Sequence, residues 1–236
     1  MKPVHTLILA DLLAQKNEKQ SENLQRFFKT AKGQYGYGDL FWGIKVPIQR
    51  AIAKKYYKKS TLVDLQKLIT SKFHECRLTS LLILTYQFPR LTEKEKKLVY
   101  NFYIKNINYV NNWDLVDLSA PRICGIYLLD KDKTILYKLA RSNSLWEKRI
   151  SILSTFWFIK ESRFEDAIKL AEILLYDKHD LMHKAVGWML REIGKKDKKV
   201  LVSFLDKYYK IMPRTMLRYS IEKFSEKERR FYMNKD

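Results

Sequence analysis

The chain has few residues that break helices and few that build covalent or metal frameworks. Its 236 residues include only 7 glycines, 5 prolines and 2 cysteines. Two cysteines cannot form a disulfide framework, and the spacing of Cys76 and Cys124 matches no metal motif. Both lie among apolar neighbours, so we expect buried free thiols, which fit a reducing compartment. These shortages exclude a small disulfide-stapled protein and favour long stretches of regular structure.

The chain also lacks a hydrophobic run long enough to cross a membrane. Its uncharged runs are short; residues 150–159, for example, are about half the length of a membrane-spanning helix. Near the N-terminus, the apolar residues 7–10 are followed directly by Asp11, which does not fit a secretory signal peptide. We therefore expect a cytoplasmic protein with no membrane partner.

Acidic residues are in short supply relative to basic ones. The chain has 46 Lys and Arg residues against 26 Asp and Glu residues, a formal net charge of +20. The basic residues spread along the whole sequence instead of gathering in a tail, which predicts a charged surface on a folded body. Nucleic acid is the partner class that such a surface favours most, and an anionic membrane surface is the weaker alternative.

Apolar residues are abundant, and most of them recur at helical spacing. Residues 62–69 and 169–175 are typical amphipathic stretches, with apolar side chains every three or four positions. No segment combines a strong alternating pattern with turn signals, so we predict an all-α protein. No shift of composition divides the chain, which predicts a single domain over residues 1–236.

The predicted helices also show a spacing typical of repeats. Several apolar helices open with a basic residue, at positions separated by 72, 35 and 30 residues: Arg77, Arg149, Lys184 and Arg214. Because 72 is twice 36, and position 113 lies midway through that interval, a repeat of about 35 residues with two helices is indicated. We predict an α-solenoid of HEAT-like antiparallel helix pairs that form a concave basic groove. An irregular helical bundle is the alternative.

One predicted helix carries an indole and a carboxylate one turn apart, Trp113 and Asp117. Residues at i and i+4 share a helix face. Asn111 or Asn112 is a suitable N-cap, and either places Asp114 in the first turn, where the helix dipole favours an acid. That explains Asp114 better than Asp117. On so basic a chain, a carboxylate beside an aromatic ring could stabilise positive charge that develops on a bound polyanion. The alternative is a core tryptophan with a carboxylate that pairs near a helix end.

A second tryptophan, Trp188, directly follows Gly187 inside another predicted helix. A helical glycine costs about 1 kcal/mol relative to alanine, so we expect close approach by either a neighbouring helix or a ligand backbone. In a solenoid the equivalent helices line one face. Side chains from several repeats are therefore predicted to converge on the groove: Trp113, Asp117, Arg149, Trp188 and Arg214. A positive groove with aromatic side chains suits a nucleic-acid duplex or strand.

Two further segments resemble functional motifs without meeting their requirements. Residues 179–183 superficially resemble a zinc motif, but Asp180 is a natural N-cap that leaves His179 outside the helix, away from His183. With no third ligand evident, we predict no metal site. The glycine-rich segment 33–47 lacks the Gly-Lys-Ser/Thr ending of a nucleotide-triphosphate loop. We expect an ordered loop that could touch a phosphate, with Pro47 in the first turn of the next helix.

Taken together and in order, several segments are similar to the AlkD-type DNA alkylation repair family: residues 38–47, 113–117, 145–149, 184–192 and 213–219. The match spans nearly the whole chain. The resemblance implies a HEAT-like-repeat DNA glycosylase that removes alkylated purines, such as 3-methyladenine and 7-methylguanine, from duplex DNA. It also implies that the enzyme works without flipping the base into a pocket. We expect a monomer that needs no cofactor and, because no lysine nucleophile has to be invoked, no cleavage of the strand.

The resemblance assigns roles by position. Asp117 looks like the family's catalytic carboxylate, and Arg149 resembles its active-site arginine. Trp113 and Trp188 look like the aromatic walls that hold the lesion's sugar and backbone. Where the family has an aromatic pair before the second tryptophan, this chain has Asp180 followed by leucine. The backbone contacts there are expected to differ, which bears on lesion range and affinity more than on the chemistry.

The chemistry of alkylated purines fits this assignment. The base is cationic, so its glycosidic bond is already weakened, and cleavage develops oxocarbenium character on the deoxyribose. A carboxylate near the sugar stabilises that cation and can position a water molecule, while tryptophan faces attract cations through their quadrupoles. We further predict that basic side chains contact the DNA backbone: Arg77, Lys184, Arg191, Arg214, Arg218 and Lys45. A non-catalytic solenoid that binds distorted DNA is the main alternative, and a scaffold for a protein partner is disfavoured by the charge.

Overall fold

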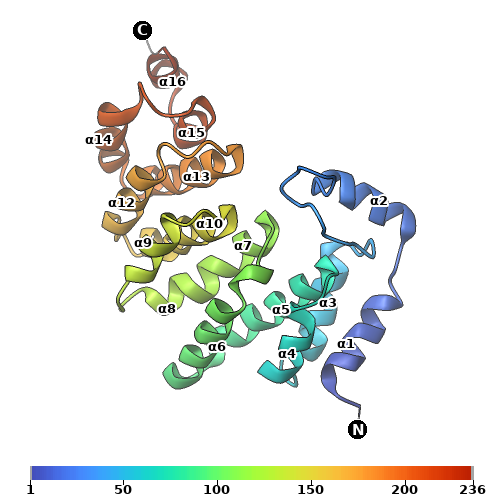
Figure 1. Ribbon diagram of the computed structural model, residues 1–236. Coiled ribbons are helices and arrows are strands. Elements are labelled where there is room, and N and C mark those ends of the chain that lie inside the picture. The colour runs from blue at the N-terminus through green and yellow to red at the C-terminus, as the bar shows by residue number, and fades with distance from the viewer. Residues whose placement is uncertain (1, 235–236) are drawn as a thin grey trace. The chain divides into compact units, whose positions relative to one another are not determined.

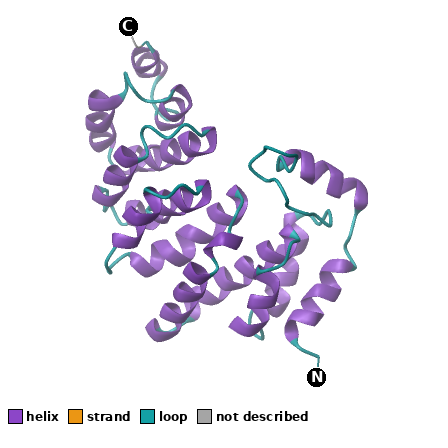
Figure 2. Ribbon diagram, viewed as in Figure 1, coloured by secondary structure: helices purple, strands orange, loops and turns teal. Residues whose placement is uncertain are grey.

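A computed structural model describes residues 2–234, and helices joined by short loops make up this part of the chain (Figure 2). Its one β-type pairing is an isolated bridge between Leu40 and Phe73. The prediction of an all-α protein is confirmed. None of the helices in residues 2–234 is both long enough and apolar enough to span a membrane.

Contacts between residues divide the chain into two compact units, Met1–Ser119 and Ala120–Asp236. Figure 1 labels most of the helices, which are numbered in chain order. The first unit contains α1 (Val4–Leu13), α2 (Glu18–Phe27), α3 (Val46–Tyr56), α4 (Leu62–Ile69), α5 (His74–Gln87), η1 (Phe88–Arg90), α6 (Glu93–Lys105), η2 (Ile107–Tyr109) and nearly all of α7 (Trp113–Ala120). The second contains η3 (Pro121–Gly125), α8 (Ile126–Leu128), α9 (Thr134–Ala140), α10 (Leu145–Ser154), α11 (Phe156–Lys160), α12 (Glu165–Ile173), α13 (Asp180–Lys196), α14 (Lys198–Tyr208), α15 (Arg214–Ser220) and α16 (Glu226–Met233). A single domain over residues 1–236 stays a prediction.

Helices that follow one another pack as pairs, in the order that the repeat spacing predicts. In the first unit α4 packs against α5, and in the second α9 packs against α10 and α12 against α13. Arg77, Arg149 and Lys184 each lie near the start of the second helix of such a pair. The spacing of these residues therefore reflects real helix pairs. The concave basic groove stays a prediction.

Helix α5 forms the centre of the first unit, because all but its last two residues are buried. Helices α1, α3 and α4 pack around it. Asp64 joins two of them: its side chain caps α4 at Thr61 and accepts a hydrogen bond from the backbone N–H of His5 at 3.1 Å. Burial alone would raise the pKa of Asp64, but hydrogen bonds from Thr61 and His5 lower it to about 2.

Helix α13 forms the centre of the second unit and packs against α10, α14 and α15. A β-carbon added to Gly187 would lie 2.6 Å from the carbonyl oxygen of Met216 and 2.6 Å from Cβ of Tyr219. Real β-carbons do not approach backbone so closely, so alanine would push α15 away. Of the two explanations for Gly187 given by the sequence, close helix packing is the one that the structure supports.

Both cysteines are free and buried, as predicted. Burial raises the pKa of the Cys76 thiol to about 12, and burial also raises the pKa of the Cys124 thiol. Since the thiolate is the reactive form, both side chains act as small apolar residues of the core.

Candidate active site on helix α7

Helix α7 begins where the sequence predicts. The side-chain oxygen of Asn112 accepts a hydrogen bond from the backbone N–H of Trp113 at 2.8 Å, and its carbonyl accepts one from Val116 at 3.1 Å. Asp114 lies in the first turn, where its Oδ1 accepts a hydrogen bond from the backbone N–H of Leu115 at 2.9 Å. Asn112, not its neighbour at 111, therefore occupies the cap position.

The two faces of α7 differ in exposure. Leu115, Val116 and Ser119 are buried, and the Ser119 hydroxyl donates a hydrogen bond to the carbonyl oxygen of Leu115. Trp113 and Asp117 are partly exposed. Because these two lie four residues apart, they share the outward face. Neither side chain is fully buried, so both are partly accessible from solvent, and a role of the Trp113–Asp117 pair in binding or catalysis stays a prediction.

The indole of Trp113 rests on aromatic rings from α2 and the segment that follows it. The ring of Phe28 stacks on it at a centroid distance of 5.4 Å and an interplanar angle of 24°. Phe41 stacks in turn on Phe28 at 5.1 Å and 15°. Phe27 meets the indole edge-on at 5.9 Å, and 61% of its surface is exposed. Sequence reasoning missed Phe27, although two consecutive phenylalanines at the end of a polar helix were a usable signal.

A buried cluster of charges lies beneath the start of α7. His74 donates or accepts at both ring nitrogens: Nδ1 lies 3.1 Å from Oδ2 of Asp39, and Nε2 lies 2.9 Å from Oδ2 of Asp114. Arg77 donates from Nη2 to Oδ1 of Asp39 at 2.6 Å. Asn112 donates from its amide to Oδ2 of Asp39 at 3.4 Å. Sequence reasoning missed this cluster because its members are far apart in the chain.

The position of Arg77 argues against the predicted contact with the DNA backbone. Only 3% of this residue is exposed, and its guanidinium also donates to the carbonyl oxygen of Ser71 at 2.9 Å. An arginine committed to a buried carboxylate and a backbone carbonyl has little surface left for phosphate. Arg77 is therefore a structural residue of the first unit.

The glycine-rich segment is an ordered loop, as predicted, and a buried glutamate fixes its second half. The Glu75 carboxylate accepts hydrogen bonds from the backbone N–H groups of Trp42, Gly43 and Ile44 at 2.9 to 3.2 Å. Gly43 has φ +85, and a β-carbon there would lie 2.0 Å from the carbonyl oxygen of Asn17, so only glycine fits. Residue 47, a proline, lies in the first turn of α3, as the sequence predicts.

A pocket of about 280 Å³ opens beside the charge cluster. The aromatic rings of Phe28 and Phe41 line it together with His74 and Asp114. Lys45, one of the predicted DNA contacts, is exposed on its rim. The pocket thus combines apolar walls with charged side chains beside the aromatic support of the candidate site.

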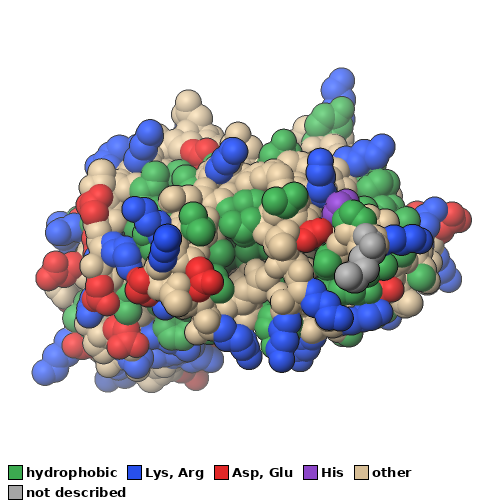
Figure 3. Space-filling view, turned by 90° about the horizontal axis from the view of Figure 1, so that it is seen from below, with side chains coloured by type: hydrophobic (Ala, Val, Ile, Leu, Met, Phe, Trp, Pro, Cys, Tyr) green, Lys and Arg blue, Asp and Glu red, His purple; other side chains and the backbone are tan. Residues whose placement is uncertain are grey.

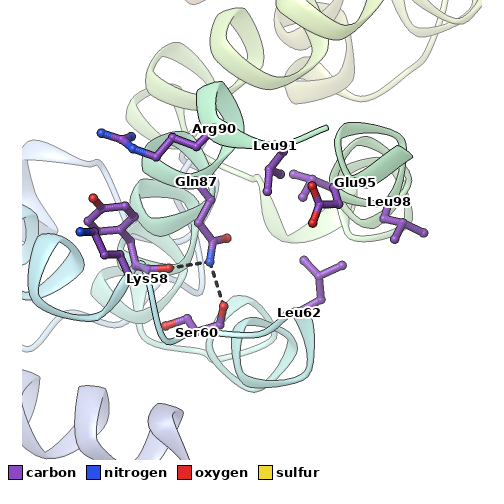
Figure 4. Close-up of a pocket in the computed structure, with 10 residues that line it drawn as sticks. Lys58, Ser60, Leu62, Gln87, Arg90, Leu91, Glu95 and Leu98 are labelled. Atoms are coloured by element: carbon purple, nitrogen blue, oxygen red, sulfur yellow. Dashed lines mark hydrogen bonds between the residues drawn. The ribbon is translucent and has the colours of Figure 1, made fainter. Parts of the chain in front are cut away.

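A larger pocket of about 370 Å³ in the first unit contains none of the predicted site residues (Figure 4). Leu62, Leu91 and Leu98 form its apolar side. The amide of Gln87 donates to the carbonyl oxygens of Tyr57 and Ser60 at 2.7 and 2.8 Å, as the dashed lines in Figure 4 show. These bonds join the ends of α3 and α5, so the polar groups there have a structural use.

In the second unit, Trp188 is partly exposed on α13. Its indole N–H donates to Oε1 of Glu192 at 3.1 Å, and the ring of Phe156 lies 6.1 Å away. Arg149 is only 5% exposed, and its Nη1 donates to the carbonyl oxygen of Leu181 at 2.5 Å. Arg149 therefore ties α10 to the first turn of α13. A contact between Arg149 and a lesion stays a prediction.

The remaining basic residues that are predicted to contact the DNA backbone differ in whether they form ion pairs with acidic neighbours. Arg214 and Arg218 on α15 are exposed. Lys184 pairs with Asp180 at 2.7 Å, and this hydrogen bond holds the pKa of the Asp180 carboxyl below its usual value. Arg191 forms an ion pair with a glutamate at position 222. Phosphate contacts from all four stay predictions, and the two on α15 are the most accessible.

The start of α13 differs in one detail from the prediction. His179, not Asp180, is the N-cap, and its Nδ1 accepts a hydrogen bond from the backbone N–H of Leu181 at 3.1 Å. Nε2 of His183 lies 2.6 Å from the carbonyl oxygen of Asp177. A histidine ring can cap a helix as an aspartate does when its unprotonated nitrogen faces the first turn. Both rings thus have structural partners.

Lys and Arg side chains appear at many places on the face drawn in Figure 3, with Asp and Glu side chains among them. This distribution agrees with basic residues that spread along the whole sequence, which carries a net charge of +20. A net charge of this size favours the approach of a polyanion.

Residues 8–224 match the family model described as "DNA alkylation repair enzyme". A predicted DNA alkylation repair enzyme from Enterococcus faecalis is similar in structure, with a TM-score of 0.71 and 16% identity over 90% of this chain and 98% of that one. AlkD2 from Streptococcus mutans is similar with a TM-score of 0.55 and 17% identity, over 89% and 99% of the two chains. No curated protein matches the chain in sequence.

Proposed function

Since the chain belongs to the family of DNA alkylation repair enzymes, we propose that it is a DNA glycosylase for alkylated, cationic purines in duplex DNA. The substrate class includes 3-methyladenine and 7-methylguanine. The observation that carries the proposal is the outward face of α7, where Trp113 and Asp117 lie one turn apart and partly exposed. A carboxylate at this position can stabilise the oxocarbenium character that develops as a glycosidic bond breaks, and the aromatic ring beside it can hold the sugar.

In the proposed reaction Asp117 faces the deoxyribose of the lesion. Departure of the neutral base leaves positive charge on the sugar, and the nearby carboxylate stabilises that charge and positions a water molecule for attack. Trp113 offers its indole face to the sugar and backbone, and the quadrupole of the ring favours a cation. Phe28 and Phe41 lie behind the indole and hold its plane.

Binding of DNA in this proposal depends on the positive charge of the protein. Lys45 in the first unit and Arg214 and Arg218 in the second are exposed and suited to phosphates. Trp188 contributes a second aromatic surface, and Arg149 supports it by holding the start of α13. No lysine nucleophile is needed, so the proposed enzyme is monofunctional and leaves the strand intact. It acts as a monomer on duplex DNA, with no cofactor.

Base release from duplex DNA that carries a single 7-methylguanine tests the proposal. The free base is separated by chromatography, a reaction without enzyme gives the spontaneous rate, and the strand is analysed for breaks. Release above the spontaneous rate with an unbroken strand is the expected result. No release, with DNA binding that weakens steeply as salt is added, would favour the alternative of a non-catalytic protein that binds distorted DNA.

A further inference from the structure

Both ring nitrogens of the buried His74 face carboxylate oxygens, one from the loop before α3 and one from the first turn of α7. We propose that His74 is a positioning residue for the proposed glycosylase. As an imidazolium it donates one N–H to Asp39 and one to Asp114, and it thereby fixes the start of α7 and the plane of Trp113. The inference rests on the proposed function of α7, because positioning matters for catalysis only if Trp113 and Asp117 meet the lesion.

Hydrogen-bond counting favours the imidazolium form. A neutral imidazole has one N–H and can donate to only one of the two carboxylates, whereas an imidazolium has two. Charge counting agrees: Asp39 and Asp114 carry two negative charges, and Arg77 supplies one of the two positive charges that balance them. A charged His74 supplies the other. Without it, a carboxylate in a buried site would lack a compensating charge, which is costly.

The surrounding electrostatics hold His74 in that form at neutral pH. Burial alone would lower the pKa of His74, but the charge and hydrogen bond of Asp114 and the hydrogen bond of Asp39 raise it to about 9. Burial alone would raise the pKa of Asp39, but the hydrogen bond from His74 and the positive charge of Arg77 hold it below the usual value. The other charged groups near the ring are Glu75, which is turned to the loop amides, and Lys45 on the pocket rim.

Three contacts transmit the position of His74 to Trp113. Asp114, which follows Trp113 in the chain, bonds to the imidazole at 2.9 Å. Asn112, which precedes it, donates to Asp39 and accepts from the Trp113 backbone. The centroid of the Phe28 ring lies 4.9 Å from that of the His74 ring and 5.4 Å from that of the indole. The residues before and after Trp113, and the ring that supports it, therefore all depend on one cluster.

The first test is independent of activity. Protein labelled with ¹⁵N in its histidines and tryptophans is followed by NMR from pH 6 to 10, with the Trp113 indole signal identified from Trp113→Phe. We expect His74 to keep both N–H groups at pH 7 and to lose one near pH 9, and the Trp113 signal to shift with it. His74→Gln should displace the Trp113 signal at pH 7, whereas His183→Gln, in the second unit, should leave it in place.

The second test asks whether the contacts of His74 affect the rate of base release. For His74→Gln we expect single-turnover release of 7-methylguanine at pH 7 to slow by about 10- to 100-fold, because a small misplacement of reacting groups is costly. Affinity for undamaged duplex should stay within about threefold, since no phosphate contact is lost. Added imidazole should restore much of the rate of His74→Ala. Added 1-methylimidazole should not, because its cation has only one N–H.

The outcomes separate the two claims. If wild type releases no base, the proposed glycosylase fails, and the NMR experiment still decides whether His74 positions Trp113. If the Trp113 signal shifts neither in His74→Gln nor when His74 titrates, His74 does not position Trp113, and the inference is overturned whether or not the protein releases 7-methylguanine. Equal rescue by imidazole and 1-methylimidazole would also overturn it. If His74 variants do not fold, Asp114→Asn serves instead: it should lower the pKa of His74 and displace the Trp113 signal.

Discussion

Replacement of Glu75 by glutamine is expected to lower the free energy of unfolding of the first unit by about 2–4 kcal/mol. Glu75 is 0% exposed, and its Oε1 accepts from the backbone amides of Gly43 at 2.9 Å and Ile44 at 3.2 Å. Both oxygens also accept from Trp42, at 3.0 and 3.1 Å. Hydrogen bonds to a charged acceptor contribute about 1.5–3 kcal/mol each, against about 1 kcal/mol for a neutral one. Glutamine keeps one acceptor oxygen but turns an N–H donor toward the N–H of Trp42.

Thermal unfolding followed by circular dichroism measures this loss. In a unit of this size 1 kcal/mol corresponds to roughly 4 °C, so the midpoint should fall by about 8–16 °C. Glu95→Gln is the matched control: Glu95 also accepts a hydrogen bond from a backbone amide, that of Thr92, but on an exposed helix start. It should cause a much smaller shift. Equal shifts for the two variants would refute the claim that Glu75 organises the loop.

Three further predictions concern packing, acid stability and DNA binding. Gly187→Ala should destabilise the second unit by about 1–3 kcal/mol in urea unfolding, because its β-carbon would meet the backbone of α15. Gly194→Ala in the same helix should cost less, because its β-carbon would meet a side chain that can move. A larger cost for Gly194→Ala would contradict the claim that Gly187 allows α15 to pack closely. The pKa of Asp64 is lowered to about 2, so the ionised carboxylate contributes roughly 2 kcal/mol to the free energy of unfolding above pH 4, and this contribution is lost as the pH falls toward 2. In Asp64→Asn the free energy of unfolding should therefore fall less steeply between pH 4 and pH 2 than in wild type. An unchanged pH dependence would exclude this contribution of Asp64. Arg149→Ala should weaken duplex binding in a fluorescence anisotropy titration, because α13 loses the hydrogen bond at its first turn, and unchanged affinity would place Arg149 outside the DNA interface.

Much of the fold could be predicted because it depends on local pattern. Apolar spacing predicted the all-α architecture, and the interval between Arg149 and Lys184 predicted helix pairs that the structure contains. The start of α7 followed from cap chemistry, with Asn112 and Asp114 in the expected places. Local rules were weaker at α13, where His179 caps the helix in place of the expected aspartate.

The candidate site could be predicted only where its residues share a helix. Trp113 and Asp117 lie on one face of α7 because of helical periodicity alone. The contact between His74 and Asp39 joins segments that lie 35 residues apart in the chain, and no periodic pattern in the sequence predicts it. Arg77 shows the opposite error: a basic residue at a repeat position suggested a surface contact, while its carboxylate partner in a distant loop holds it inside. A charge run can be read from sequence, but the partner of a single buried charge cannot.

The most direct test of the proposed function is the single-turnover rate of 7-methylguanine release by Asp117→Asn, measured beside its affinity for the same duplex. Asp132→Asn, which removes a carboxylate from an exposed turn, is the control. If Asp117 stabilises the developing sugar cation, its loss should slow release by about 100-fold or more. Affinity should stay equal or become tighter, because a negative charge near phosphates is removed. A rate within threefold of wild type would contradict the role of Asp117 and the mechanism built on it.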